Sequence, residues 1–158
     1  LFSPRLVKWC AQTGRFTFFK ETSCRMDFIQ PKLEAVRGSN FRFFNANTET
    51  LLASLRSGCD GFSGVMANVH PQLYAWLLNN YKDNPEKAEK LQAYLFQAGL
   101  MVETEYYSLN AKFLLHHRGV SIQVNSRNPK VKQPSEEVKA MMMKMAEDDQ
   151  KMLGYLNI

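Results

Sequence analysis

Three short strand-forming runs alternate with single helical segments in the first half of the chain, and this alternation constrains the fold more than any other feature. The runs occupy residues 16–19 (FTFF), 41–44 (FRFF) and 61–65 (GFSGV). Strands that are separated by single helices pair in parallel through right-handed crossovers. In FTFF and FRFF, apolar residues occupy both the odd and the even positions apart from one polar residue each. This pattern is typical of strands buried on both faces. The sequence therefore predicts an α/β protein.

Periodic apolar residues and their glycine, serine or proline boundaries predict the helices. We expect helices at residues 3–13, 26–36, 48–57 and 71–81, with Pro31 delaying or bending the second. Beyond residue 84 only helices are expected, at 85–101, at 104–117 and after Ser135, which is predicted to cap the last one. Residues 120–134 are predicted to form an extended connection. The chain is therefore divided into βα units (1–82) and a C-terminal helical extension (83–158).

Composition and charge exclude several function classes. The net charge of +5 is spread thinly, and no run of five basic residues occurs, so we expect no nucleic-acid partner. The apolar runs are far shorter than the roughly 18 residues that a membrane span needs, so no membrane association is expected. Cys10, Cys24 and Cys59 lack CxxC spacing. They are predicted to be reduced thiols in a cytoplasmic protein, with no metal site.

Lys20 is the side chain best placed for chemistry, because it follows FTFF directly. In parallel α/β folds ligands bind at the carboxyl ends of the strands, where Asn45 and Ser63 are also expected. Alternation places Phe16, Phe18 and Lys20 on one face of the first strand. Removing an amine from water disfavours its charged form, and the neutral amine is the nucleophile that forms Schiff bases. The residues alone also allow a plain strand end with a solvated lysine.

The stretch FFKETSC, followed after a helix by FRFFNANTETLLASLRSGCDGFSGVMANVHPQLY, resembles the dihydrodipicolinate synthase and N-acetylneuraminate lyase family of class I aldolases. That family has a strand that ends in the imine-forming lysine, then a second strand that ends in a short polar loop. A helix, a glycine-containing motif and a third strand follow. The family's glycine motif and the small residues after it are matched here by Gly58, Asp60, Gly61, Ser63, Gly64, Ala67 and Asn68.

The resemblance implies the C-terminal part of a TIM (β/α)8 barrel, about three βα units, followed by extra helices. It implies that Lys20 forms an imine with pyruvate or a pyruvate-derived keto acid, without a cofactor or a metal. Glu21 and Thr22 would orient the lysine, although Glu21 is equally explained as an acid at a helix start. The predicted substrate-binding residues are Asn45, Asn47, Thr48 and Ser63.

The resemblance also bears on partners. The family's carboxylate-binding loop and proton-shuttling tyrosine lie on earlier strands, which this chain does not contain, so we expect a requirement for the N-terminal half of the barrel. A homo-oligomer, a homotetramer by the family's pattern, is expected too. Two alternatives stay open. One is a noncatalytic binding or regulatory relative, or an inactive fragment of the same barrel, and the other is a stand-alone flavodoxin-like domain.

Overall fold

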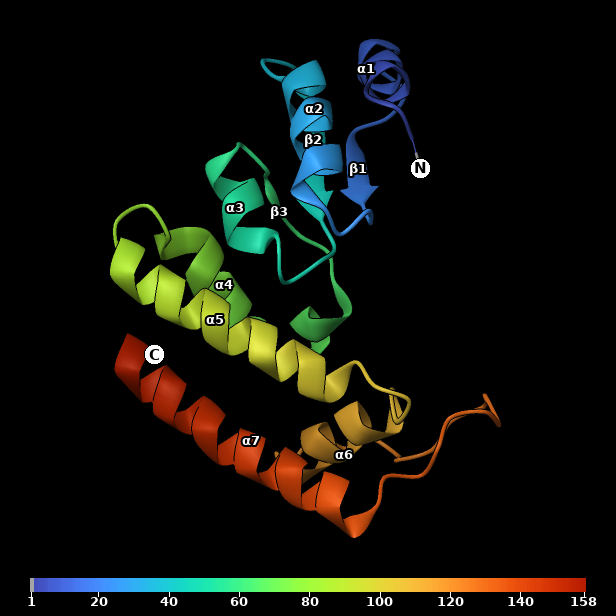
Figure 1. The fold of residues 1–158 in the computed structure, drawn as a ribbon, viewed down its shortest axis with the longest axis vertical. Coiled ribbons are helices and arrows are strands. Elements are labelled where there is room, and N and C mark those ends of the chain that lie inside the picture. The colour runs from blue at the N-terminus through green and yellow to red at the C-terminus, as the bar shows by residue number, and fades with distance from the viewer. Residues whose placement is uncertain (1) are drawn as a thin grey trace. The chain divides into compact units, whose positions relative to one another are not determined.

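The computed structural model of the protein describes residues 2–158 (Figure 1). It divides into two compact units, one that ends at Gln92 and one from Ala93 to Ile158. The division falls inside a helix, whereas the sequence suggested a change of character near residue 83. Its elements are α1 (Pro4–Gln12), β1 (Phe18–Glu21), α2 (Met26–Val36), β2 (Arg42–Asn45), α3 (Leu51–Arg56), β3 (Gly61–Phe62), the 3-10 helix η1 (Val65–Asn68), α4 (Pro71–Asn80), α5 (Pro85–Val102), α6 (Leu109–His117) and α7 (Glu136–Leu156).

The first unit is built on a three-stranded sheet in the order β1-β2-β3, and both strand pairs are parallel. Lys20 lies opposite Phe44, and Phe44 lies opposite Gly61. The parallel βα prediction is therefore confirmed. Consecutive strands are also neighbours, without the reversal of strand order that marks a doubly wound, flavodoxin-like sheet. The arrangement is that of a barrel segment.

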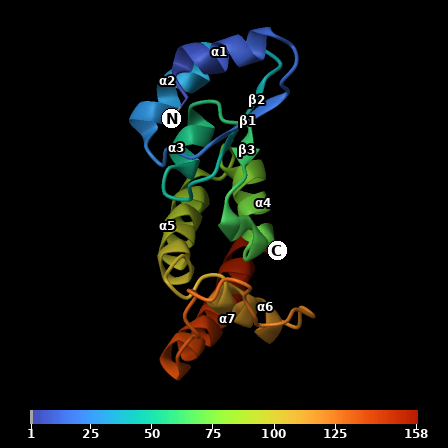
Figure 2. The same cartoon turned by 90° about the vertical axis from the view of Figure 1, so that its right-hand side faces the viewer.

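The two faces of the sheet have different environments. Helices α2 and α3 lie on one side of the strands in the turned view (Figure 2). On this helix face Phe43 is 1% exposed and Glu21 is equally buried. On the opposite, open face Phe18 is 61% exposed, and Lys20 and Arg42 are exposed as well. The prediction that the strands are buried on both faces is therefore wrong for this chain, in which helices cover one face only.

The strand boundaries differ from those expected. β1 begins at Phe18 and ends at Glu21, so Lys20 lies inside the strand rather than after it. Pairing with β2 sets this boundary, because Phe18 is the first residue in register with a β2 partner. β3 is only two residues long, and η1 begins at Val65, where strand was expected. Apolar character alone does not reveal where the ladder of a strand begins.

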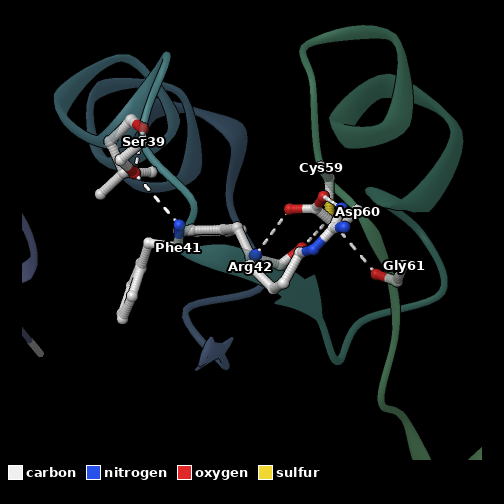
Figure 3. A network of polar contacts seen from close by, with 8 residues as sticks. Ser39, Phe41, Arg42, Cys59, Asp60 and Gly61 are labelled. Carbon is white, nitrogen blue, oxygen red and sulfur yellow. Dashed lines mark hydrogen bonds and ion pairs between the residues drawn. The ribbon is translucent and has the colours of Figure 1, made fainter. Parts of the chain in front are cut away.

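A network of polar contacts joins β2 to the start of β3 (Figure 3). One Asp60 carboxylate oxygen accepts a hydrogen bond from the Phe43 backbone N–H at 2.8 Å, and the other pairs with Arg42 at 2.7 Å. The buried Cys59 thiol lies 3.0 Å from the Phe43 carbonyl oxygen and 3.2 Å from that of Gly61. Burial raises the pKa of the Cys59 thiol. This cysteine therefore acts as a packing residue, and all three cysteines are free.

The second unit contains most of α5 together with α6 and α7. As predicted, Ser135 caps α7, and its hydroxyl accepts a hydrogen bond from the Val138 N–H. The Tyr94 hydroxyl donates to the buried Asp149 carboxylate at 2.6 Å, and Arg118 pairs with the same carboxylate. Burial raises the pKa of Tyr94 to about 12. Among the helices of residues 2–158, none is long and apolar enough to cross a membrane.

Candidate functional site

Lys20 borders a hollow of about 270 Å³ on the first unit. The other residues that line it are Phe18, Phe44, Phe62 and Ser63. The hollow is lined by residues of β1, of β2 and of β3 or its end, and it brings Lys20 together with one predicted binding residue, Ser63. It contains one amine and one hydroxyl side chain among aromatic rings. An exposed amine in this setting can react with the carbonyl carbon of a bound molecule.

The aromatic walls of the hollow are held in place by their neighbours. The Phe18 and Phe44 rings meet edge to face with centroids 6.0 Å apart. The Phe62 ring stacks on Tyr74, from α4, with centroids 4.3 Å apart and the planes almost parallel. Such ring pairs contribute about 0.5–1.5 kcal/mol beyond the burial of their area. Each of the three rings therefore has an aromatic neighbour that favours its position.

Two glycines make room for these rings. A Cβ at Gly61 would lie 2.8 Å from the Phe44 ring, and a Cβ at Gly64 would lie 2.2 Å from the Phe62 ring. At Gly64 the same atom would also lie 2.5 Å from the Ala46 carbonyl oxygen, which belongs to the backbone and cannot rotate away. Close packing around the hollow thus explains Gly61 and Gly64, whereas Gly58 of the same motif has a φ of +102° and no close neighbour among the described residues.

Glu21 faces away from the hollow and forms a buried ion pair with Lys32 on α2. Its other carboxylate oxygen accepts a 2.6 Å hydrogen bond from the Ser23 N–H. Burial alone would raise the pKa of the Glu21 carboxyl, but the hydrogen bonds from Lys32 and Ser23 outweigh it and hold the pKa below its usual range. Glu21 therefore joins β1 to α2, and this geometry favours a structural role over the predicted orientation of Lys20.

Asn45 is completely buried on the helix face, opposite to Lys20. Its amide nitrogen donates to the hydroxyls of Thr50 at 2.9 Å and Ser54 at 3.0 Å. Its amide oxygen accepts from the Asn47 N–H at 2.8 Å. With these three bonds Asn45 fixes the turn between β2 and α3, which favours a structural role over the predicted contact with substrate.

The two other predicted residues of this loop are also engaged. The Asn47 side-chain oxygen accepts from both the N–H and the hydroxyl of Thr50, each at 3.0 Å. The buried Thr48 hydroxyl shares a 2.7 Å hydrogen bond with the Tyr74 hydroxyl. α3 consequently begins at Leu51, later than expected, because residues 48–50 form this hydrogen-bonded turn. Neither side chain lines the hollow beside Lys20.

Thr22 lies beside a second hollow, of about 330 Å³, which Lys20 also borders. Phe2, Phe19, Glu21 and Lys32 complete its lining. Thr22 is exposed, and its carbonyl oxygen lies 3.5 Å from the Cys24 thiol. Of the two predicted orienting residues, Thr22 is therefore the one that remains near the lysine with a free surface.

Several residues that shape the site were not predicted from the sequence. Lys32 was overlooked because a lysine on a helix is normally solvated, yet it follows Ile29 by three residues and so shares the buried side of α2. Tyr74 and Phe62 were overlooked because aromatic residues in helices and strands are common in protein cores. Within residues 2–158, no group of three or more His, Cys, Asp or Glu side chains is placed to hold a metal ion.

Comparison with known proteins agrees with this geometry. The model of the dihydrodipicolinate synthetase family matches residues 3–148. The chain belongs to this family. Its three parallel strands and C-terminal helices are accordingly the C-terminal part of a TIM barrel with its helical extension. No curated protein sequence matches the chain significantly.

Solved structures of dihydrodipicolinate synthetase relatives share the fold. A monomeric dihydrodipicolinate synthase variant superposes with a TM-score of 0.83 at 20% identity, over 96% of this chain and 51% of the variant. The synthase from Thermotoga maritima gives 0.80 at 21% identity, over 94% and 51% of the two chains. YagE, a prophage protein of the same family from E. coli K12 solved with pyruvate, gives 0.78 at 21%, with the same coverage. The chain thus spans about half the length of these relatives.

Proposed function

We propose that this chain carries the imine-forming half of an aldolase-type lyase that acts on pyruvate or a pyruvate-derived keto acid. The observation that supports it is the position of Lys20, exposed on the open face of the sheet and beside Ser63 in one hollow. Family membership supports the same reaction class. The pyruvate complex of YagE supports a small keto acid as substrate.

In the proposed reaction, the neutral Lys20 amine attacks the ketone carbon and one molecule of water leaves, which gives an imine. Protonation of the imine nitrogen makes it an electron sink. A proton-transfer group on the N-terminal strands would take the proton of the hydroxyl on the outer carbon as the C–C bond to that carbon breaks. The electron pair of that bond moves into the sink to form an enamine, and the other fragment leaves as an aldehyde. Protonation of the enamine carbon and addition of water then release pyruvate and the free amine. No cofactor takes part in this scheme.

The open face indicates what the chain needs for this reaction. Phe18, Lys20 and Arg42 lie uncovered on the side of the sheet that a closed barrel turns inward. The N-terminal strands of the barrel would cover this face and supply the carboxylate-binding and proton-transfer groups. We infer that activity requires these strands. We also propose that the complete protein forms a homo-oligomer and works in the cytoplasm.

Reductive trapping tests the proposal. The protein that carries this chain together with the N-terminal strands is incubated with pyruvate and sodium cyanoborohydride, and its intact mass is measured. We expect one reduced pyruvate adduct per chain, located on Lys20 by peptide mapping. The Lys20→Arg variant should give no adduct.

Lys8→Arg is the matched control, because Lys8 is an exposed lysine of the same unit that lines neither hollow beside Lys20. It should be labelled like the unmodified sequence. Absence of an adduct in the protein with the N-terminal strands would contradict the proposal and favour a noncatalytic relative.

A further inference from the structure

The hollow beside Lys20 offers few partners for a hydroxylated substrate. Of its five lining side chains, Phe18, Phe44 and Phe62 are hydrocarbon rings, and only Ser63 has a hydroxyl. The ring faces accept only weak hydrogen bonds, which do not replace those that a sugar hydroxyl makes in water. Burial of a hydroxyl without a hydrogen-bond partner is strongly unfavourable.

The polar side chains at the end of β2 and in the loop before α3 are engaged in other hydrogen bonds. Asn45 is fully buried on the helix face and bonded to Thr50, Ser54 and the Asn47 N–H. Thr48 is bonded to Tyr74. To turn any of these groups toward the hollow, the loop between β2 and α3 would have to break several buried hydrogen bonds, each of which is expensive to leave unmade.

The aromatic walls, by contrast, are built into the packing. Gly61 and Gly64 leave the space that the Phe44 and Phe62 rings occupy, and Tyr74 holds Phe62 from behind. A flat apolar group placed among these rings would lose no hydrogen bond. An open-chain polyol has no such flat face to present.

We propose, on the basis of the proposed function, that this side of the Lys20 site accepts 2-keto acids with an apolar, ring-sized substituent in preference to polyhydroxylated ones. The substituent would lie among Phe18, Phe44 and Phe62 while the ketone carbon meets the lysine. Among the residues of this chain that line this hollow, Ser63 would be the single hydroxyl that a polar atom of the substrate could reach.

Competing trapping rates test this inference. Phenylpyruvate and 2-keto-3-deoxygluconate are each incubated with the protein that carries the N-terminal strands and with cyanoborohydride, at concentrations below saturation. Each rate of adduct formation on Lys20 is divided by the rate for free Nα-acetyl-lysine, which removes differences in ketone reactivity. We expect the normalised rate to be about tenfold or more higher for phenylpyruvate, the ratio expected when one hydroxyl is left unpaired.

Two variants locate the preference. Phe18→Leu is suited to the test because Phe18 lines the hollow and its ring meets Phe44 edge to face, and we expect the phenylpyruvate preference to fall about threefold or more, together with the ring contact. Phe44→Leu should act in the same direction. Phe16→Leu is the matched control: Phe16 is exposed on the chain that leads into β1 but does not line the hollow, so the preference should not change.

The outcomes separate this inference from the proposed function. If pyruvate is trapped on Lys20 but 2-keto-3-deoxygluconate reacts as fast as phenylpyruvate or faster, the inference is wrong and the proposed function stands. An unchanged preference in both Phe18→Leu and Phe44→Leu would likewise overturn it. If pyruvate itself gives no adduct, both the proposed function and the inference fail.

Discussion

The two faces of the sheet use the same strands for different purposes. On the helix face, Glu21 and Asn45 are buried and every side-chain oxygen or nitrogen of theirs is hydrogen-bonded within the unit. On the open face, Lys20 is exposed beside aromatic rings. Polar residues at the ends of parallel strands therefore do not all belong to a site. Whether such a side chain points to the helix face or to the open face decides whether it is bonded within the fold or exposed beside the hollow.

The largest effect should come from breaking the buried ion pair on the helix face. Lys32→Met leaves the Glu21 carboxylate buried without its partner. Loss of one member of a buried pair typically lowers the free energy of unfolding by about 3–5 kcal/mol. Urea denaturation followed by circular dichroism measures the change. The double variant Glu21→Leu with Lys32→Met should recover much of the loss, and a single variant as stable as the parent would show that the pair does not join β1 to α2.

Asn45→Ala tests the second polar residue of the helix face. It removes the partner of the Thr50 and Ser54 hydroxyls and of the Asn47 N–H, in a buried setting. We expect the free energy of unfolding to fall by about 2–3 kcal/mol, because these groups lose a partner away from water. The rate of pyruvate trapping per folded molecule should stay close to that of the parent. If Asn45→Ala were as stable as the parent but gave no pyruvate adduct on Lys20, Asn45 would instead belong to the site.

The pH dependence of stability sharpens the comparison further. The folded-state pKa of Glu21 lies below its ordinary value of 4.5, so the unfolded chain binds its proton first as the pH falls. The contribution of Glu21 is therefore present above that value and is lost as the pH drops through the folded pKa. We expect the urea concentration at the unfolding midpoint to decrease once the pH is lowered below about 4.5. The acid dependence should be weaker in Lys32→Met, and an equal dependence in both proteins would assign it to other carboxylates.

The smallest effect on stability should come from the open face. Lys20→Met alters an exposed side chain without a hydrogen bond or ion pair among the contacts described for residues 2–158. We expect the free energy of unfolding to change by no more than about 0.5 kcal/mol, while the pyruvate adduct disappears. Urea unfolding of this chain measures the first quantity, and intact-mass analysis of the protein that carries the N-terminal strands measures the second. A strongly destabilised Lys20→Met protein would contradict the separation of the two faces.

The sequence predicted the elements and their pairing well, since βα alternation, Ser135 as a cap and the parallel sheet all follow from local patterns and chain chirality. It was less informative about the face of the sheet on which each polar side chain lies, because this depends on the residue at which β1 begins to pair with β2. FTFF suggested a strand that ends before Lys20, and the actual strand runs on to Glu21.

The predicted binding residues separate for the same reason. Ser63 lies beside Lys20, whereas Asn45, Asn47 and Thr48 are engaged in the loop before α3. Amides and hydroxyls after a strand serve equally well as turn formers and as ligand contacts. Only the three-dimensional hydrogen bonds distinguish the two uses, and these arise from Thr50, Ser54 and Tyr74, which are distant in sequence or lack a recognisable motif.

The alternation along β1 has a consequence for how such a protein can change. Lys20 and Glu21 are adjacent in the chain, yet their side chains leave the sheet in opposite directions. Substitutions at Phe18, Phe44 or Ser63, which we propose to set selectivity, would therefore leave the Glu21–Lys32 pair in place to anchor the strand. A gene with this layout can be diversified at the open-face codons alone, and a laboratory library restricted to those positions should retain a large fraction of folded members.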